Sequence, residues 1–202
     1  MRIATWNVNS VNARLPTVLA WLEAAQPDVV GFQEIKCLDE KFPREAFESL
    51  GYNVETNGQK TYNGVALLSK YPLSDVRRGL PGVDASGFEA EFEQARYIEA
   101  VIECPRPVRV GCLYLPNGNP VGTEKFAYKL EWLAQVRAWL AQQLVRWPKL
   151  VVLGDFNIAP ADRDVHDPAA WHEQVLCSTP EREALRNLLA LGLHDSFRVL
   201  DP

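Results

Sequence analysis

The 202-residue sequence has no apolar run near the roughly 18 residues of a membrane span, and no basic-then-apolar leader precedes its first strand-like segment. It also has no internal repeat, no low-complexity segment and no linker. Hydrophobic residues make up 47% of the chain and charged residues 23%, as in an ordinary globular protein. These features favour one cytoplasmic domain that does not contact a membrane.

Cysteine is sparse, and no Cys-x-x-Cys pair occurs. The four cysteines are scattered along the chain: Cys37, Cys104, Cys112 and Cys177. This distribution fits reduced, mostly buried thiols in a cytosolic protein better than a disulfide framework or a zinc site.

An excess of positive charge is also missing, because the formal net charge is −5. That value argues against a protein that binds nucleic acid through bulk charge. However, the stretch from Asp84 to Glu103 holds six acidic residues and one basic residue. The acidity is therefore local, and the remaining surface is free to carry a basic face.

The pattern of apolar runs, caps and breaks predicts a mixed α/β fold. Strands are expected at residues 2–8, 28–32, 52–56, 64–69, 76–80, 96–104, 108–115 and 149–153. The first helix is expected to begin after a cap at Asn9, Ser10 or Asn12 and to stop at Gln26. Further helices are expected at residues 43–50, 123–147, 169–174 and 179–191, with Thr179 as the cap of the last one, and a polar acidic loop at 82–94. Hairpins that alternate with strand–helix steps favour mixed sheets over purely parallel ones.

The last predicted strand ends in Gly154-Asp155-Phe156-Asn157. Asp155 and Asn157 are two residues apart, so in an extended chain both side chains point to the same side. A carboxylate and an amide held there could bind a metal, a water molecule or a phosphate. A strand followed by an Asx-stabilised turn explains the same residues equally well.

Three other predicted strands also end in a chemically capable residue: Asn7, Glu34 and Tyr114. If these strands share one end of a sheet, the side chains converge with those of the last strand. Carboxylate oxygens suit Mg²⁺, which keeps several waters and takes one or two protein carboxylates. Neutral amides and a phenol could bind phosphate oxygens. The set therefore predicts metal-assisted phosphoryl chemistry.

Each of these residues also has a purely structural explanation. Asn7 could cap the first helix, and Tyr114 could be a half-buried aromatic residue. Glu34 could form a surface ion pair with Lys36 or Lys60. The convergence of all the strand ends is what favours the functional interpretation.

Six short motifs, in order along the chain, resemble the exonuclease III family of the exonuclease–endonuclease–phosphatase superfamily. They are Trp6-Asn7-Val8-Asn9, Gln33-Glu34-Ile35-Lys36, Gly58-Gln59-Lys60, Asn63-Gly64-Val65-Ala66, Arg78-Gly79 and Leu153-Gly154-Asp155-Phe156-Asn157-Ile158. Three further motifs extend the resemblance towards the last residue: Trp171-His172, Ser178-Thr179-Pro180-Glu181-Arg182 and Leu191-Gly192-Leu193-His194-Asp195-Ser196-Phe197-Arg198.

This resemblance implies a four-layer α-β-β-α sandwich with two mixed sheets, in a single domain over residues 1–202. It implies that Glu34 is the main metal ligand, with Asn7, Asp155 and Asn157 at the metal or the phosphate. It also implies that Tyr114 contacts the scissile phosphate and that Asp155 orients or deprotonates the attacking water beside Asn157. The implied cofactor is Mg²⁺, with Mn²⁺ as a substitute.

The implied activity is that of a DNA phosphodiester hydrolase in base-excision repair. Such an enzyme removes nucleotides 3′ to 5′, cuts at abasic sites and clears blocked 3′ ends, so the implied partner is duplex DNA with 3′ ends or abasic sites. The implied DNA contacts are Lys60 and Tyr62, with Arg96, Lys125 and Lys129 as weaker candidates. At full length the protein is expected to be a monomer.

The sequence departs from the family because its C-terminal quarter is not present in these 202 residues. In the family that segment carries an Arg-Ile-Asp strand and a terminal Ser-Asp-His motif with the catalytic histidine; His166, His172 and His194 do not stand in such a motif. We therefore expect a fragment or a natural truncation with impaired catalysis. Two alternatives remain open: a phosphodiesterase or phosphatase acting on RNA or a small phosphate ester, and a catalytically dead DNA-binding remnant.

Overall fold

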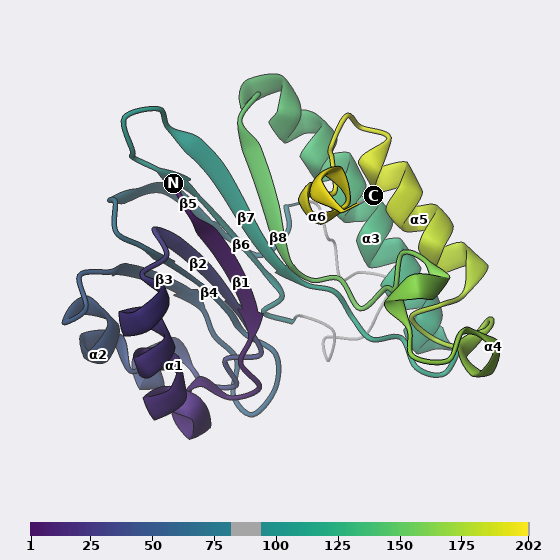
Figure 1. Ribbon diagram of the computed structural model, residues 1–202, viewed down its shortest axis with the longest axis horizontal. Helices are drawn as coiled ribbons and strands as arrows, with labels where there is room; N and C mark the ends of the chain where they lie inside the picture. The colour runs from purple at the N-terminus through teal and green to yellow at the C-terminus, as the bar shows by residue number, and fades with distance from the viewer. Residues whose placement is uncertain (82–93, 202) are drawn as a thin grey trace. The chain divides into compact units, whose positions relative to one another are not determined.

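The computed structural model describes residues 1–81 and 94–201 (Figure 1). These residues fall into two compact units. Unit 1 is made of Met1–Tyr114 and Leu144–Asp155, and unit 2 of Leu115–Gln143 and Phe156–Pro202. Both β-sheets lie in unit 1, so this unit carries most of the strand ends that the sequence singles out.

The acidic loop predicted at residues 82–94 lies outside the described residues, except for Gln94. The single domain expected over residues 1–202 stays a prediction. Among the helices that the structure describes, none is long and apolar enough to cross a membrane.

The first sheet of unit 1 has the strand order β1-β2-β4-β3. Its strands are β1 (Ile3–Asn7), β2 (Val29–Gln33), β3 (Asn53–Asn57) and β4 (Val65–Ser69). β1 and β2 are parallel, whereas β4 is antiparallel to both of its neighbours. Because β1 and β2 run in the same direction, Asn7 and the residue after Gln33 lie at the same edge of the sheet.

The second sheet of unit 1 has the order β5-β6-β7-β8. Its strands are β5 (Leu73–Arg78), β6 (Tyr97–Ile102), β7 (Val108–Tyr114) and β8 (Leu150–Asp155). The first three are antiparallel, and β7 and β8 are parallel with Tyr114 opposite Asp155. The prediction of two mixed sheets is thus confirmed, and β5 is the edge strand that the sequence suggests.

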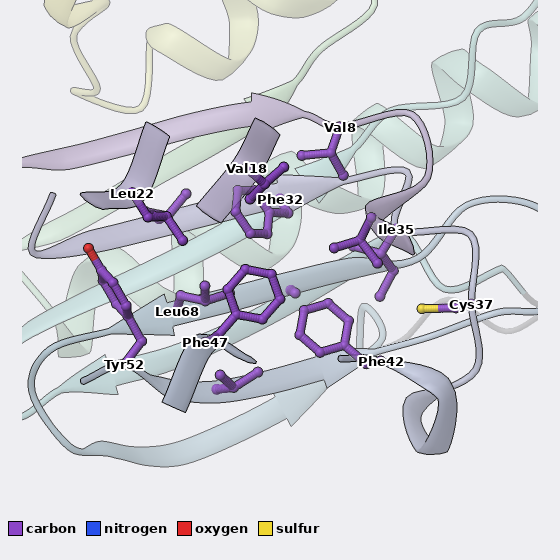
Figure 2. Close-up of a cluster of buried hydrophobic side chains, with 14 residues drawn as sticks. Val8, Val18, Leu22, Phe32, Ile35, Cys37, Phe42, Phe47, Tyr52 and Leu68 are labelled. Atoms are coloured by element: carbon purple, nitrogen blue, oxygen red, sulfur yellow. The ribbon is translucent and has the colours of Figure 1, made fainter. Parts of the chain in front are cut away.

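Helices α1 (Val11–Ala25) and α2 (Arg44–Glu48) cover one face of the first sheet, near the short 3-10 helix η1 (Asp39–Lys41). Figure 2 shows the core between these layers, in which Phe47 of α2 packs with its ring centroid 5.2 Å from that of Phe42 and 6.0 Å from that of Phe32. Ser10 caps α1 by accepting a hydrogen bond from the Ala13 N–H at 3.4 Å. Ser10 is thus the cap among the three candidates that the sequence offers, and α1 begins at the next residue, Val11.

The other face of the first sheet packs on the second sheet. Val29, Val65 and Leu67 join side chains of β6, β7 and β8 in one buried cluster. Gly31 lies at this contact: a Cβ there would be 2.1 Å from Leu153 Cδ1. Only glycine allows the two sheets to approach this closely at that point. Both faces of β2 and β4 are covered, which explains why every residue in these strands is buried.

Unit 2 contains residues 124–143 of α3 (Glu124–Arg146), together with η4 (Asp162–Asp164), α4 (Pro168–Trp171), α5 (Thr179–Leu189) and α6 (Ser196–Leu200). α3 and α5 lie side by side (Figure 1), and Arg137 Nε of α3 donates to the Asn187 carbonyl at 3.1 Å. The N-cap of α5 is Ser178, whereas the sequence predicts Thr179. The difference arises because Ser178 and Glu181 form a capping box, which shifts the cap by one residue.

Candidate active site

Two carboxylates from different sheets meet at one amide in unit 1. Asn7, the last residue of β1, donates from Nδ2 to Glu34 Oε1 at 2.7 Å and to Asp155 Oδ2 at 2.9 Å. Glu34 directly follows β2, and Asp155 is the last residue of β8. The structure therefore brings together three of the strand ends that the sequence singles out, with one amide between two acidic groups.

The segments after β1 and β2 hold these side chains in place. The Val8 N–H donates to the Gln33 carbonyl at 3.0 Å, and the Ser10 N–H to the Glu34 carbonyl at 2.8 Å. Asn7 Oδ1 accepts a hydrogen bond from the Asn9 N–H at 3.1 Å. Asn7 therefore stabilises a turn through its oxygen while its nitrogen contacts the two carboxylates. The prediction that Asn7 could cap the first helix is wrong, because Ser10 is the N-cap of α1.

Lys36 neutralises Glu34 from the other side. Its Nζ lies 2.9 Å from Glu34 Oε2 and donates to Asn9 Oδ1 at 2.6 Å. Burial by itself would raise the pKa of Glu34, but hydrogen bonds from Asn7, Lys36 and Tyr114 outweigh it and leave that pKa below its usual value. Glu34 is thus ionised at neutral pH, which is the form of a carboxylate that can bind a cation.

Tyr114, at the end of β7, is the fourth residue of the cluster. Its hydroxyl donates to Glu34. Burial raises the pKa of Tyr114 to about 12, with the charge and hydrogen bond of Glu34 adding to the effect. The phenol is therefore neutral at pH 7 and acts as a donor. Arg96 lies over the ring, 4.7 Å from its centroid, and donates to the Tyr114 carbonyl at 3.1 Å.

Asn157 belongs to unit 2, and its backbone has φ +46°. The expectation that Asp155 and Asn157 form one extended stretch is therefore wrong: β8 ends at Asp155, and the left-handed conformation turns the chain. Asn157 Nδ2 donates to the Leu115 carbonyl at 2.8 Å, and its Oδ1 accepts from Asn117 Nδ2 at 3.3 Å.

The expected DNA contacts are found in different surroundings. Lys60 and Tyr62 are exposed in the loop between β3 and β4, and Tyr62 is 67% exposed. Lys125 is exposed at the start of α3. Arg96 is partly buried against Tyr114. Lys129 is fully buried beside Glu181, so it cannot contact DNA directly, and that weaker candidate is wrong.

The donor set of this cluster fits a hard divalent cation. Among residues 1–81 and 94–201, no three His, Cys, Asp or Glu side chains gather into a metal-binding group. Glu34 and Asp155 are nevertheless two carboxylates within reach of one amide, which is the number Mg²⁺ commonly takes from a protein. In this geometry Asn7 orients the carboxylates with its nitrogen, and its own role as a metal ligand stays a prediction.

Sequence reasoning missed the roles of several residues in unit 2 that hold Asn157, directly or through one another. Asn117 lies three residues after Tyr114, and this proximity to a strand end was a usable signal. Ser178 and Glu181 have the spacing of a capping box, which sequence alone can indicate. Lys129 carries no such signal, because a lysine in an amphipathic helix is normally solvent-exposed.

Comparison with known proteins extends these observations. Residues 4–175 match the model of the Endonuclease/Exonuclease/phosphatase family. The chain is 36% identical over 214 aligned residues to exodeoxyribonuclease III of Haemophilus influenzae, covering all of this chain and 76% of that protein.

Two solved structures share the fold. A 3′ phosphatase, NExo from Neisseria, bound to a product DNA hairpin, has a TM-score of 0.90 and 44% identity; an AP endonuclease from Archaeoglobus fulgidus has a TM-score of 0.87 and 35% identity. Each alignment covers 98% of this chain and 74% of the other. The match confirms the predicted fold class. The chain therefore belongs to the Endonuclease/Exonuclease/phosphatase family, among its exodeoxyribonuclease III homologues.

Proposed function

We propose that this protein is a Mg²⁺-dependent DNA-repair nuclease that hydrolyses phosphodiesters at 3′ ends and abasic sites of duplex DNA. The observation that carries the proposal is the amide of Asn7 between the carboxylates of Glu34 and Asp155, at 2.7 and 2.9 Å. The relatives named above, an exodeoxyribonuclease, a 3′ phosphatase and an AP endonuclease, support DNA as the substrate.

Glu34 and Asp155 would hold the cation, with Asn7 beside them. When bound, Mg²⁺ polarises a phosphoryl oxygen and makes a bound water more acidic. Asp155 orients the attacking water and accepts its proton, because its carboxylate is fixed by Asn7. Tyr114 stays protonated at neutral pH and donates a hydrogen bond to the phosphate. Asn157 holds a further phosphate oxygen through its side-chain amide.

The surface loop with Lys60 and Tyr62 would contact the DNA backbone. An exposed lysine supplies charge to a phosphate, and an exposed tyrosine supplies a hydroxyl and a flat face. Arg96 would act near the scissile phosphate, because it is held against Tyr114. Lys125, exposed at the start of α3, would add a peripheral phosphate contact.

Cleavage of a duplex with one abasic site tests the proposal, using the protein as its gene encodes it. We expect cutting in the presence of Mg²⁺ and none after chelation. Glu34→Gln and Asp155→Asn should each abolish cutting. Glu48→Gln is the matched control, since it also removes a carboxylate paired with a basic residue, at the surface.

The same assay separates the alternatives. Hydrolysis of RNA or of a phosphoinositide, without cutting of DNA, would refute the DNA-nuclease proposal and leave a phosphoesterase of the same family. DNA binding that Glu34→Gln and Asp155→Asn leave unchanged, with no cleavage by the wild type, would identify a catalytically dead binding protein.

We further propose that the protein acts as a monomer in the cytoplasm. The thiols of Cys37, Cys104, Cys112 and Cys177 are all free, which suits a reducing compartment. Light scattering of the purified protein would measure its mass in solution, and a mass of two or more chains would contradict the monomer.

A further inference from the structure

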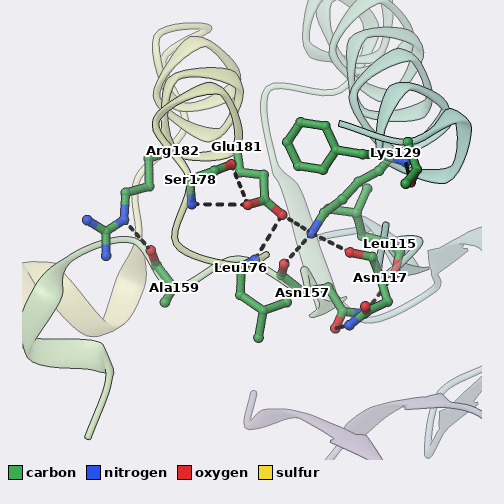
Figure 3. Close-up of polar contacts among 11 residues, drawn as sticks. Leu115, Asn117, Lys129, Asn157, Ala159, Leu176, Ser178, Glu181 and Arg182 are labelled. Atoms are coloured by element: carbon green, nitrogen blue, oxygen red, sulfur yellow. Dashed lines mark hydrogen bonds and ion pairs between the residues drawn. The ribbon is translucent and has the colours of Figure 1, made fainter. Parts of the chain in front are cut away.

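Lys129 of α3 is a lysine with no solvent exposure, and its ammonium group contacts three acceptors in unit 2 (Figure 3). Nζ donates to the Asn117 carbonyl at 2.9 Å, to the Asn157 carbonyl at 2.6 Å and to the carboxylate of Glu181. An ammonium group has three donors, and each of them finds a partner here. Two of the partners are main-chain oxygens, so Lys129 joins two loops rather than two side chains.

Glu181, which is also fully buried, is itself held in place at the start of α5. Its Oε2 accepts from the Ser178 N–H at 3.1 Å and from Ser178 Oγ at 2.6 Å, and its Oε1 accepts from the Leu176 N–H at 3.1 Å. The carboxylate therefore cannot turn without breaking the cap of α5. Because the Glu181 carboxylate is fixed, the Lys129 ammonium group that pairs with it is also fixed.

Asn157 is the residue on which these contacts converge. Its carbonyl accepts from Lys129, its Nδ2 donates to the Leu115 carbonyl, and its Oδ1 accepts from Asn117 (Figure 3). Its left-handed backbone, with φ +46°, is a conformation that needs such support. The main chain and the side chain of Asn157 are thus both fixed before any substrate binds.

Stability alone does not account for this arrangement. A buried ion pair gains little over well-packed apolar side chains of similar volume, because removing two charges from water offsets their attraction. What apolar side chains could not provide is a donor for the carbonyls of Asn117 and Asn157. The specific contribution of Lys129 is therefore the position of these two loops.

We propose that the buried Lys129–Glu181 pair is a positioning device that sets the Asn157 amide for catalysis. The inference rests on the proposed function, in which Asn157 holds a phosphate oxygen. Lys129 and Glu181 touch neither substrate nor cation. They act through the backbone of Asn157, and their effect should therefore fall on the rate of the bound complex and not on DNA affinity.

The test replaces the pair by Lys129→Met with Glu181→Gln, which removes both charges together and keeps an acceptor for Ser178. We expect kcat for abasic-site cleavage to fall about 10- to 100-fold, because small misplacements of a reacting group have effects of that size. KM should change by less than about threefold, and near-UV circular dichroism should stay native. Lys129→Arg is a second variant that keeps the charge beside Glu181, so it can be measured if the pair variant does not fold. It should give a smaller fall in kcat than the pair variant.

The matched control is the buried pair of Glu99 and Arg109 in unit 1, which is likewise fully unexposed. Arg109 lies near the start of β7, at the opposite end from Tyr114. Glu99→Gln with Arg109→Met should therefore leave kcat unchanged at a temperature where the protein is folded. An equal fall in kcat for both pair variants would overturn the positioning role and indicate a general loss of rigidity.

A double-mutant cycle with Asn157→Ala gives the sharpest readout. If Lys129 acts through Asn157, replacing the pair in the Asn157→Ala background should lower kcat by no more than about twofold. A full additive loss would overturn the inference. If the wild type does not cut DNA, the proposed function fails; if the wild type and the pair variant cut equally fast, only the positioning role fails.

Discussion

Replacing Asn7 by alanine should reduce cleavage far more than it reduces stability. The change removes hydrogen bonds of 2.7 and 2.9 Å to the carboxylates of Glu34 and Asp155. Hydrogen bonds to charged groups contribute about 1.5–3 kcal/mol each, which gives about 3–6 kcal/mol for the two if both act in the transition state. At about 1.4 kcal/mol per tenfold, kcat/KM should fall between about 100- and 20,000-fold.

The free energy of unfolding should fall by only about 1–2 kcal/mol, because the site is partly exposed and water can reach both carboxylates in the variant. Lys36 still neutralises Glu34 from its other side. The two quantities are measured by initial rates on a duplex with one abasic site and by urea unfolding at pH 7.

Asn53→Ala is the matched control for this prediction. Asn53 Nδ2 also donates twice, to the Ser69 carbonyl at 3.1 Å and to the Tyr71 carbonyl at 3.0 Å, but at the opposite end of the first sheet. It should cost similar stability and leave the rate unchanged. If Asn7→Ala cuts within tenfold of the wild type, the idea that this amide organises the carboxylates is refuted.

Three further predictions concern the scaffold and the cation. Gly154→Ala would place a Cβ 2.0 Å from the Leu113 carbonyl oxygen, so urea unfolding should show that the free energy of unfolding falls by roughly 2–5 kcal/mol. The control Gly51→Ala has open space around the added Cβ and only the strain of φ +83°, so it should lose about 1 kcal/mol. Equal losses in the two variants would contradict the steric argument. Chelation should end cleavage yet change the free energy of unfolding by less than about 1 kcal/mol, because the site carboxylates are already hydrogen-bonded; a large drop in the melting temperature would contradict this. Burial would raise the pKa of Asp75, but its contacts with Arg109 leave that pKa below its usual value, so this stabilisation is complete above the unfolded-state pKa and is lost as pH falls through the folded-state pKa. Asp75→Asn should therefore flatten the acid limb of the stability–pH curve by less than about 1 kcal/mol, since the side chain is 47% exposed; an unchanged limb would contradict the assignment.

The strand ends could be predicted from the sequence because of chain direction. β1 with β2, and β7 with β8, are the parallel pairs of the two sheets, so residues at their carboxyl ends necessarily share an edge. Short apolar runs that end in Asn7, Glu34, Tyr114 and Asp155 are therefore enough to propose a cluster. The sequence motifs indicate the family, and the resemblance to that family indicates which reaction the cluster would catalyse.

The arrangement around Asn157 could not be predicted in the same way. Alternation along a strand says nothing about a left-handed residue just beyond its end, so the extended geometry expected from Asp155 to Asn157 fails. Lys129 and Glu181 are 52 residues apart, and each has an ordinary local explanation, as a polar helix residue and as part of a capping box. Only the tertiary structure shows that they bury their charges together.

The polar residues of the cluster each use one group for the fold and another for the site. Asn7 fixes a turn with Oδ1 and the two carboxylates with Nδ2. Tyr114 packs its ring under Arg96 while its hydroxyl contacts Glu34. Because the structural contact fixes the orientation of each group of the proposed site in advance, little reorganisation would remain for the moment of reaction, and electrostatic catalysis gains most from such preorganisation. It follows that substitutions which preserve the charge but break the structural contact should still impair the enzyme.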